Sequence, residues 1–290
     1  MNLDIERFLD RSRAVETGDL DWALAARQGL SELEAAALRY MADTENNTIL
    51  YLRRVLAGHT TRNYELIAFL ACWLYEETHH GRAIDRFLAA CGYAQARPRY
   101  EEVVATTGAS QRIAGALTRT AAVLTPHFTA VHMAWGAISE MFAAASYTQL
   151  ARRTENTELR RLLLRVAQDE RRHQTFYYEQ ARRRLEASRF AQRLTRFGLG
   201  RFWTPVGDGV GGEDGDPGIV GALLHDNAWS RREWDRIDAM MGRLPGLAGF
   251  DLSRRRALET IAAFKQKRPA LAQAIREDNA AIGGRFTPLD

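Results

Sequence analysis

The sequence is poor in cysteine and has no long apolar run. Its 290 residues include two cysteines, and Cys72 and Cys91 fall in one predicted helix, so we expect reduced thiols rather than a disulfide. No window approaches the roughly 18 uncharged apolar residues of a transmembrane helix, so we expect no membrane span. The first residues, MNLDIERFLDRSR, lack the apolar core of a signal peptide. These absences favour a cytoplasmic protein.

Excess charge of one sign is also absent overall, because the net charge is only +4. Arginine nevertheless dominates the basic residues and clusters in residues 160–165 and 181–201. Such clusters are either solvated helix faces or a docking surface for an acidic partner. A nucleic-acid partner is disfavoured because no groove-reading motif accompanies the charge.

Apolar residues recur with the period of a helix over most of the chain, and almost nowhere with the period of a strand. Ser31 and Glu34 form a predicted capping box at a helix start, and Gly92 suits a helix end. Pro126 fits a first turn, and Asn156 fits an N-cap. We expect a short helix before Gly18 and then helices over residues 31–58, 61–92, 110–124, 126–154 and 156–188.

The composition changes after Trp203. Residues 204–218 are rich in glycine and contain two prolines, which is typical of a loop or linker. Two or three helices follow, the last over about residues 252–279. We therefore predict two parts. Residues 1–203 form a bundle with an N-terminal helical segment, and residues 204–290 form a linker and a C-terminal helical appendage packed on the bundle.

Two ExxH motifs lie on long predicted helices. Glu77 and His80 form one, and Glu170 and His173 form the other. A spacing of three residues places both side chains on one helix face, where they can bind one metal ion. Each motif also lies in an apolar, core-facing stripe, where an ionised carboxylate is costly unless it is paired or bound to metal.

The two remaining long helices each supply one glutamate in an apolar stripe, Glu45 and Glu140. The order is Glu, ExxH, Glu, ExxH, and similar gaps separate Glu45 from Glu77 and Glu140 from Glu170. The longer gap between Glu77 and Glu140 suits a crossover. This pattern predicts an all-α, ferritin-like four-helix bundle with one long crossover, additional C-terminal helices and a metal site in its core. The competing interpretation is a set of buried carboxylates paired with arginines.

Four carboxylates and two imidazoles favour two iron ions, or manganese, because a structural zinc site would be expected to use thiolates. Such a pair can activate O2 against an unactivated C–H bond. Neighbouring groups should orient the histidines, and we expect Asp169 to contact His80 and Glu76 to contact His173. The alternative register, Glu76 with His79, lies on a wetter face. His79, His127 and His132 are interpreted as surface or packing residues.

Small residues surround Glu140 at positions 136, 137 and 143–145. They predict either close helix packing or room for an apolar substrate channel beside the metals, and both interpretations remain open. The residues predicted to line that channel are Trp73, Met133, Gly136, Phe142, Ala143 and Phe176.

Around the two motifs the sequence resembles the soluble acyl-acyl carrier protein desaturases. Residues 73–81, WLYEETHHG, are similar to that family's W-x-x-E-E-N-R-H-G, and residues 169–173, DERRH, to its D-E-K-R-H. The resemblance covers residues 31–188 and favours Glu77 and His80 as ligands. It implies a homodimeric di-iron enzyme that uses O2 and two electrons from a ferredoxin-like donor to desaturate a carrier-bound acyl chain. The stretch Arg182–Arg196 would then be a dock for the acidic acyl carrier protein.

One position departs from the family. Desaturases carry a threonine one turn after the third-helix glutamate, where this chain has Ala143. A di-iron hydroxylase of a small or carrier-bound substrate therefore remains open. An N-oxygenase is disfavoured because Val166 replaces that group's additional histidine. A ferroxidase or iron store would be a shorter chain, and a non-catalytic helical interaction protein would leave six matched ligands without a role.

Overall fold

The computed structural model describes residues 5–93, 120, 122–205, 224, 227–267, 269–270 and 272–273. Within these ranges the secondary structure consists of helices, with no strand. The first half of the chain holds α1 (Ile5–Leu9), α2 (Trp22–Gln28), α3 (Glu32–Asn46), α4 (Thr48–Leu56), η1 (His59–Arg62) and α5 (Tyr64–Ala90). The second half holds α8 (Phe128–Arg153), α9 (Thr157–Glu186), α10 (Arg189–Phe202), α12 (Ala228–Met241) and α13 (Leu252–Lys267).

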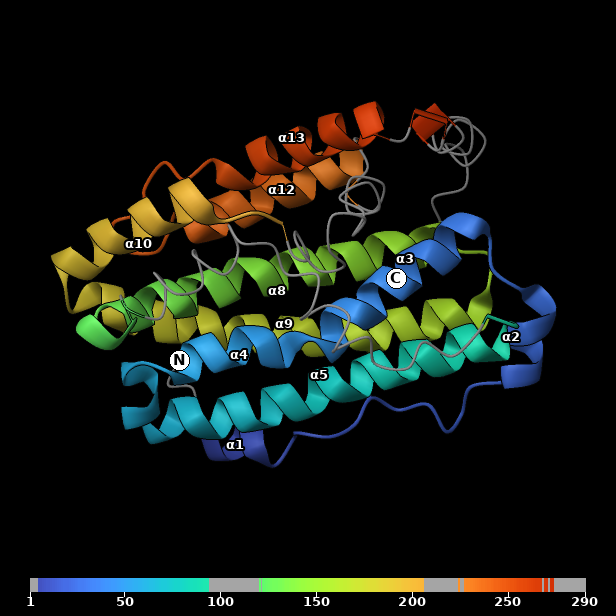
Figure 1. Ribbon diagram of the computed structural model, residues 1–290, viewed down its shortest axis with the longest axis horizontal. Coiled ribbons are helices and arrows are strands. Elements are labelled where there is room, and N and C mark those ends of the chain that lie inside the picture. The colour runs from blue at the N-terminus through green and yellow to red at the C-terminus, as the bar shows by residue number, and fades with distance from the viewer. Residues whose placement is uncertain are drawn as a thin grey trace.

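Four long helical segments form the body of the molecule: α3 with α4, α5, α8 and α9 (Figure 1). α8 and α9 are antiparallel and joined by a short turn, whereas α5 ends and α8 begins at opposite ends of the bundle. Most of the connection between them lies outside the described residues. The fold is the predicted all-α, ferritin-like bundle. None of the described helices combines the length and apolarity needed to cross a membrane.

Helix ends follow the signals in the sequence. Ser31 and Glu34 form the predicted capping box, and the Asn156 side chain accepts a hydrogen bond from the backbone of Leu159. Asn156 also donates to the carbonyl oxygens of residues 25 and 29, which ties α2 to the start of α9. α5 ends before Gly92, whose φ of 87° is the left-handed conformation that favours glycine.

The prediction of a single helix over residues 31–58 is wrong in one respect, because the structure divides this segment into two helices at Asn47. The Asn47 backbone has φ −101° and ψ 8°, outside the helical region. Its side-chain amide donates to the Asp43 carbonyl oxygen over 2.7 Å. Thr44 and Thr48 each donate a hydroxyl hydrogen bond to the carbonyl four residues earlier. Such bonds compete with the helical ladder and bend helices, which explains why α4 starts anew.

Other boundaries differ less. α8 begins at Phe128, two residues after Pro126. The helix predicted over residues 110–124 lies outside the described residues except for 120 and 122–124, which are helical. α13 ends at Lys267, and most of residues 268–279 lie outside the described part. α2 was not predicted.

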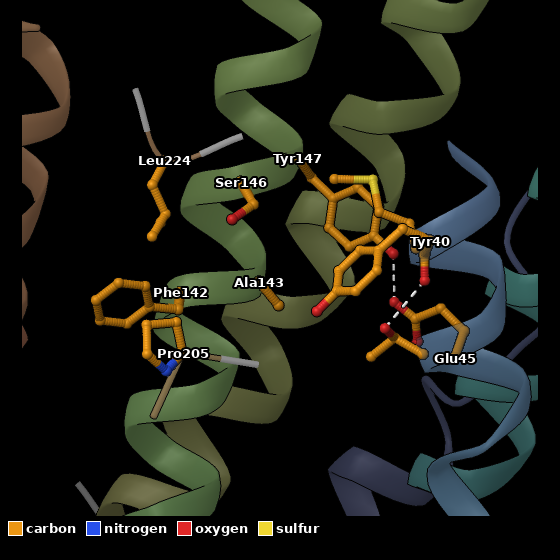
Figure 2. A pocket seen from close by; sticks show the side chains of 10 residues that line it. Tyr40, Glu45, Phe142, Ala143, Ser146, Tyr147, Pro205 and Leu224 are labelled. Atoms are coloured by element: carbon orange, nitrogen blue, oxygen red, sulfur yellow. Dashed lines mark hydrogen bonds between the residues drawn. The ribbon is translucent and has the colours of Figure 1, made fainter. Parts of the chain in front are cut away.

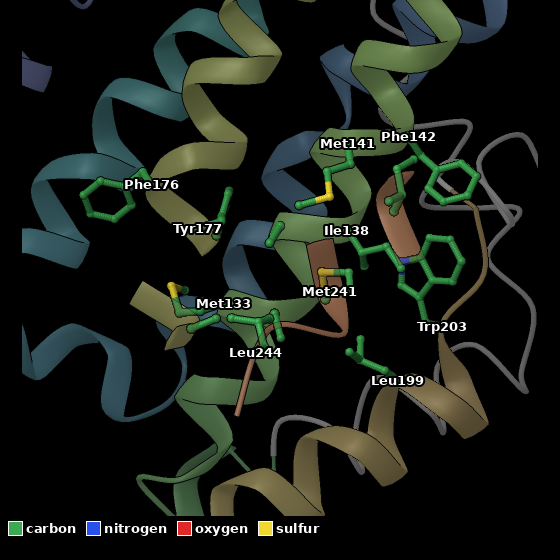
Figure 3. Packing of buried hydrophobic residues seen from close by; sticks show 14 of the residues in the cluster. Met133, Ile138, Met141, Phe142, Phe176, Tyr177, Leu199, Trp203, Met241 and Leu244 are labelled. Carbon is green, nitrogen blue, oxygen red and sulfur yellow. The ribbon is translucent and has the colours of Figure 1, made fainter. Parts of the chain in front are cut away.

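The C-terminal helices share the core of the bundle. Trp203 follows α10 and packs in the same cluster as Met241 of α12 and Leu244 after it, against Ile138 and Phe142 of α8 (Figure 3). The packing of this segment on the bundle is therefore extensive. The boundary between residues 203 and 204 stays a prediction.

A close approach of α8 and α9 gives a test of the packing near Glu140. A Cβ at Gly136 would lie 2.4 Å from the ring of Tyr177, which is fully buried. We expect Gly136→Ala to lower the free energy of unfolding by about 1–3 kcal/mol, since the ring must move within a dense core. Gly200→Ala, with nothing within 4 Å, is the matched control and should be neutral or stabilising. Urea denaturation measures both, and equal stability of the two variants would contradict the packing.

Candidate metal centre

The four long helical segments bring together the six residues that the sequence analysis selected. Glu45 comes from α3, Glu77 and His80 from α5, Glu140 from α8, and Glu170 and His173 from α9. All six are buried. Their donor atoms fall into two groups, within each of which the atoms lie within 4.8 Å of one another. One group is Glu45, Glu77, His80 and Glu170, and the other is Glu77, Glu140, Glu170 and His173.

The two histidines are oriented alike. The Nδ1 atom of His80 lies 3.3 Å from Glu170 Oε1, and Nδ1 of His173 lies 3.0 Å from Glu77 Oε1. Each Nδ1 thus faces the carboxylates of the other ExxH helix, and each Nε2 points outward. This leaves both rings able to offer Nδ1 to a metal ion while Nε2 is held from outside.

The outward nitrogens make the two contacts expected from the sequence. Nε2 of His80 lies 3.3 Å from Asp169 Oδ2, and Nε2 of His173 lies 2.6 Å from Glu76 Oε2. Arg172 joins these two carboxylates, because it donates to Glu76 and lies 3.2 Å from Asp169. Sequence reasoning missed Arg172, although its spacing of three residues from Asp169 on α9 is a signal for that pair.

Two further side chains donate hydrogen bonds to Glu140 and Glu45, the glutamates that each belong to only one donor group. The Trp73 indole N–H donates to Glu140 Oε1 over 3.1 Å, and the Tyr147 hydroxyl donates to Glu45 Oε1. Trp73 was predicted to line a substrate channel, whereas Tyr147 entered only as a member of an apolar stripe. The pattern of one tyrosine two turns after Glu140 does not by itself indicate which carboxylate it reaches.

The carboxylates crowd one another away from water. Burial raises the pKa of Glu45, Glu77 and Glu140, and the neighbouring Glu170 adds to this shift. The pKa of Glu170 is lowered, because its hydrogen bonds with Glu140 and both histidines outweigh its burial. The cluster therefore binds protons when no cation is present, and a divalent cation would replace them.

The pKa values of the two histidines are also raised, although burial alone would lower them. Burial opposes their charge, but hydrogen bonds with carboxylates outweigh it. Those with Asp169 and Glu170 raise the pKa of His80 to about 9. Those with Glu170 and Glu76 raise the pKa of His173 to about 10. In the metal-free protein both imidazoles are thus protonated at neutral pH.

The donor set fits a pair of metal ions. Glu45 Oε2 has no hydrogen-bond partner among the described residues, and Glu77 Oε1 and Glu170 Oε1 face the Nδ1 atoms of His173 and His80 at 3.0 and 3.3 Å. An unpartnered carboxylate oxygen in a core costs stability unless a ligand occupies it. Glu77 and Glu170 belong to both groups, so each has the position of a bridging carboxylate. Oxygen and imidazole donors without thiolate could hold iron or manganese.

The other histidines lie elsewhere. His79 is partly exposed and its ring is 4.5 Å from that of Tyr75. His127 contacts Phe190, and His132 contacts Phe128. None of the three belongs to the two donor groups.

A pocket that is partly open to solvent lies between α3 and α8 and reaches Glu45 and Tyr147 (Figure 2). Of the six residues predicted to line a channel, Phe142 and Ala143 line this pocket. The others lie in the core: Met133 is fully buried, Gly136 packs on Tyr177, and Phe176 stacks on Phe69 at 3.9 Å. Of the two interpretations of the small residues, close helix packing therefore applies to Gly136, whereas Ala143 borders an open pocket.

The arginine-rich stretch Arg182–Arg196 spans the end of α9 and half of α10. Arg182 forms ion pairs with Glu179 and Glu186, and Arg183 with Glu179 and Glu65. Arg189, Arg193 and Arg196 are exposed. A dock for an acidic carrier protein here stays a prediction.

A ferritin-like bundle with buried carboxylate and histidine donors defines this chain as a candidate metal protein. The model of a protein family described as fatty acid desaturase matches residues 52–191. That span contains Glu77, His80, Glu140, Glu170 and His173, whereas Glu45 precedes it. Searches of curated proteins and of solved structures each found no match. The family match and the buried cluster together suit a di-iron oxidoreductase.

The raised histidine pKa values predict how the stability of the metal-free protein depends on pH. The stabilisation from His80 and His173 is complete below their ordinary pKa of 6.5 and is lost as pH rises through about 9 and about 10. The raised pKa values of Glu77 and Glu140 act in the same direction, because the folded state keeps protons that the unfolded chain releases.

We therefore expect the melting temperature of the metal-free protein to fall as pH rises from 6.5 toward 10. Differential scanning calorimetry measures it, with the manganese-loaded protein as the control. The loaded protein should show a smaller change, because bound metal replaces these protons. A melting temperature that rises over this range without metal would contradict the electrostatic description.

Proposed function

We propose that this protein is an O2-dependent di-iron oxidoreductase, similar to acyl-acyl carrier protein desaturases, that oxidises an unactivated C–H bond of an apolar acyl chain. The observation that carries the proposal is the sharing of Glu77 and Glu170 between two donor groups. Glu45 and His80 would complete one iron site, and Glu140 and His173 the other. The competing interpretation, buried carboxylates paired with arginines, is disfavoured because Glu77 and Glu170 pair with the two histidine Nδ1 atoms, and Glu45 Oε2 has no hydrogen-bond partner among the described residues.

Two iron ions in this site would supply the redox chemistry that couples reduction of O2 to removal of hydrogen from carbon. Desaturation balances when O2 takes two electrons from a ferredoxin-like donor, two protons from solvent, and two hydrogens with their electrons from the chain. The products are an alkene and two waters. The donor and a homodimeric assembly belong to this proposal.

The chain's own residues position the ligands and exclude water. Asp169 and Glu76 fix the histidine rings through Nε2, and Arg172 balances the charge of both carboxylates. Trp73 and Tyr147 each occupy one oxygen of a terminal glutamate, which leaves the second oxygen free for metal. Preorganised ligands of this kind cost no rearrangement when the ion binds.

The pocket beside Glu45 supports an apolar substrate. Phe142, Ala143 and Leu224 line it together with Met41 and Pro205. An apolar segment there would lie against the ligand cluster and away from bulk water. The same position favours a second candidate, hydroxylation, because Ala143 lines the pocket and brings no hydroxyl where desaturases carry threonine.

Metal stoichiometry tests the shared ligands. We expect the wild-type chain to bind two Mn²⁺ ions, and Glu45→Ala to weaken one of them. Glu170→Ala should weaken both, because its carboxylate belongs to both donor groups. Removing a ligand typically lowers metal affinity by at least about tenfold. Glu158→Ala is the matched control, since Glu158 is a buried glutamate of α9 that pairs with Arg161 outside the cluster.

Isothermal titration calorimetry and metal analysis measure these affinities. Loss of a single ion in Glu170→Ala, or wild-type protein that binds no metal, would contradict the assignment.

Activity distinguishes the two oxidations. Iron-loaded, reduced protein is mixed with O2 and an octadecanoyl carrier-protein substrate, and the product is identified by mass spectrometry. Loss of two hydrogens supports desaturation, and gain of one oxygen supports hydroxylation. Neither product from fully iron-loaded protein would contradict a role in acyl-chain oxidation, while the metal site would stand.

A further inference from the structure

Exposed apolar side chains occur on α10 and just before α8, two helices that begin at the same end of the bundle (Figure 1, left). Leu124 is 77% exposed, Phe190 57% and Phe197 63%. The ring of His127 lies 5.3 Å from that of Phe190, which joins the start of α8 to α10. We call Val123, Leu124, Phe190 and Phe197 the apolar end. Leu56, the last residue of α4, and Tyr64, the first residue of α5, are also exposed.

Phe190 and Phe197 lie on one face of α10. They are seven residues apart, which is close to two full helical turns. The opposite face, with Ala191, Thr195 and Leu199, is buried against the bundle. α10 therefore has apolar residues on both faces: one face is buried against the bundle, and the solvent-exposed face carries two large aromatic side chains. Single exposed phenylalanines are ordinary, whereas a group of exposed apolar side chains is a candidate interaction surface.

The same face is uniformly basic. α10 has no acidic residue, and its arginines are Arg189, Arg193, Arg196 and Arg201. Among the described residues, Arg189 and Arg193 form no ion pair, in contrast to Arg182 and Arg183 on α9. A partner that binds this surface should therefore carry negative charge and also offer an apolar environment to the aromatic side chains.

One occupant is disfavoured by these features. A second copy in a two-fold dimer would place like arginines against each other. A folded acidic protein would also suit the charge, and its binding is an outcome that the experiment below separates from lipid binding. Arg193 lies between Phe190 and Phe197 along the helix, so this surface offers both cationic and aromatic side chains to an anionic lipid surface.

We propose that the apolar end and α10 bind the surface of an anionic lipid membrane. Phe190, Phe197 and Leu124 enter the headgroup region, and Arg189 and Arg193 contact lipid phosphates. This inference does not depend on the metal centre, so either can fail without the other.

Sedimentation with vesicles tests this binding. We expect the full chain to bind vesicles of equal parts phosphatidylcholine and phosphatidylglycerol, and to bind pure phosphatidylcholine far more weakly. The double variant Phe190→Ser/Phe197→Ser should bind at least about tenfold more weakly, because it lacks the two rings that enter the membrane in the wild type. Arg189→Gln and Arg193→Gln should each weaken binding by about fivefold, in a manner that added salt suppresses.

Matched controls lie away from this surface. Tyr75→Ser on α5 removes an exposed aromatic residue, and Arg39→Gln on α3 removes an exposed arginine. Both should bind like the wild type, and circular dichroism should show that every variant is folded. The proposal is overturned if the wild type fails to bind the mixed vesicles, or if the phenylalanine variant binds them normally. It is also overturned if light scattering shows a dimer that this variant dissociates, or if these variants lose only binding of an acidic carrier protein.

Discussion

The repulsion among four carboxylates buried at the centre of the bundle is the interaction on which the rest of the site depends. Glu77 and Glu170 lie between Glu45 and Glu140, and all four are removed from water. Burying an unpaired ionised carboxylate costs several kcal/mol, so the metal-free cluster is held together by protons and by two charged imidazoles. A divalent pair would relieve this cost, which favours a chemical role for the arrangement over a purely structural one.

The surrounding helices are shaped to hold that cluster. α3 breaks two residues after Glu45, where Asn47 donates to the Asp43 carbonyl oxygen. Gly81 follows His80 and lets α5 approach Asn46, because a Cβ there would lie 2.3 Å from the Asn46 side chain. Gly136, one turn before Glu140, admits the ring of Tyr177 in the same way. The helix break and both close approaches lie within about one turn of a proposed ligand.

The six proposed ligands could be selected from the sequence because their information is local and periodic. The ExxH spacing fixes two side chains on a helix face, and matched gaps set Glu45 level with Glu77 and Glu140 level with Glu170. The positions of Glu76 and Asp169 followed from the same periodicity. Tyr147, Arg172 and the hydrogen bond from Trp73 could not be assigned, because they depend on how neighbouring helices rotate about their axes. The break at Asn47 depends on side-chain competition for one carbonyl oxygen, which hydrophobic periodicity does not record.

The position of the metal ions tests the central claim most directly. Crystals of the iron-loaded protein, measured at the iron absorption edge, should show two anomalous peaks between the carboxylates of Glu77 and Glu170, with Nδ1 of His80 and of His173 each facing one peak. A single peak, or iron bound only at surface carboxylates with Glu77 and Glu170 unliganded, would contradict the account.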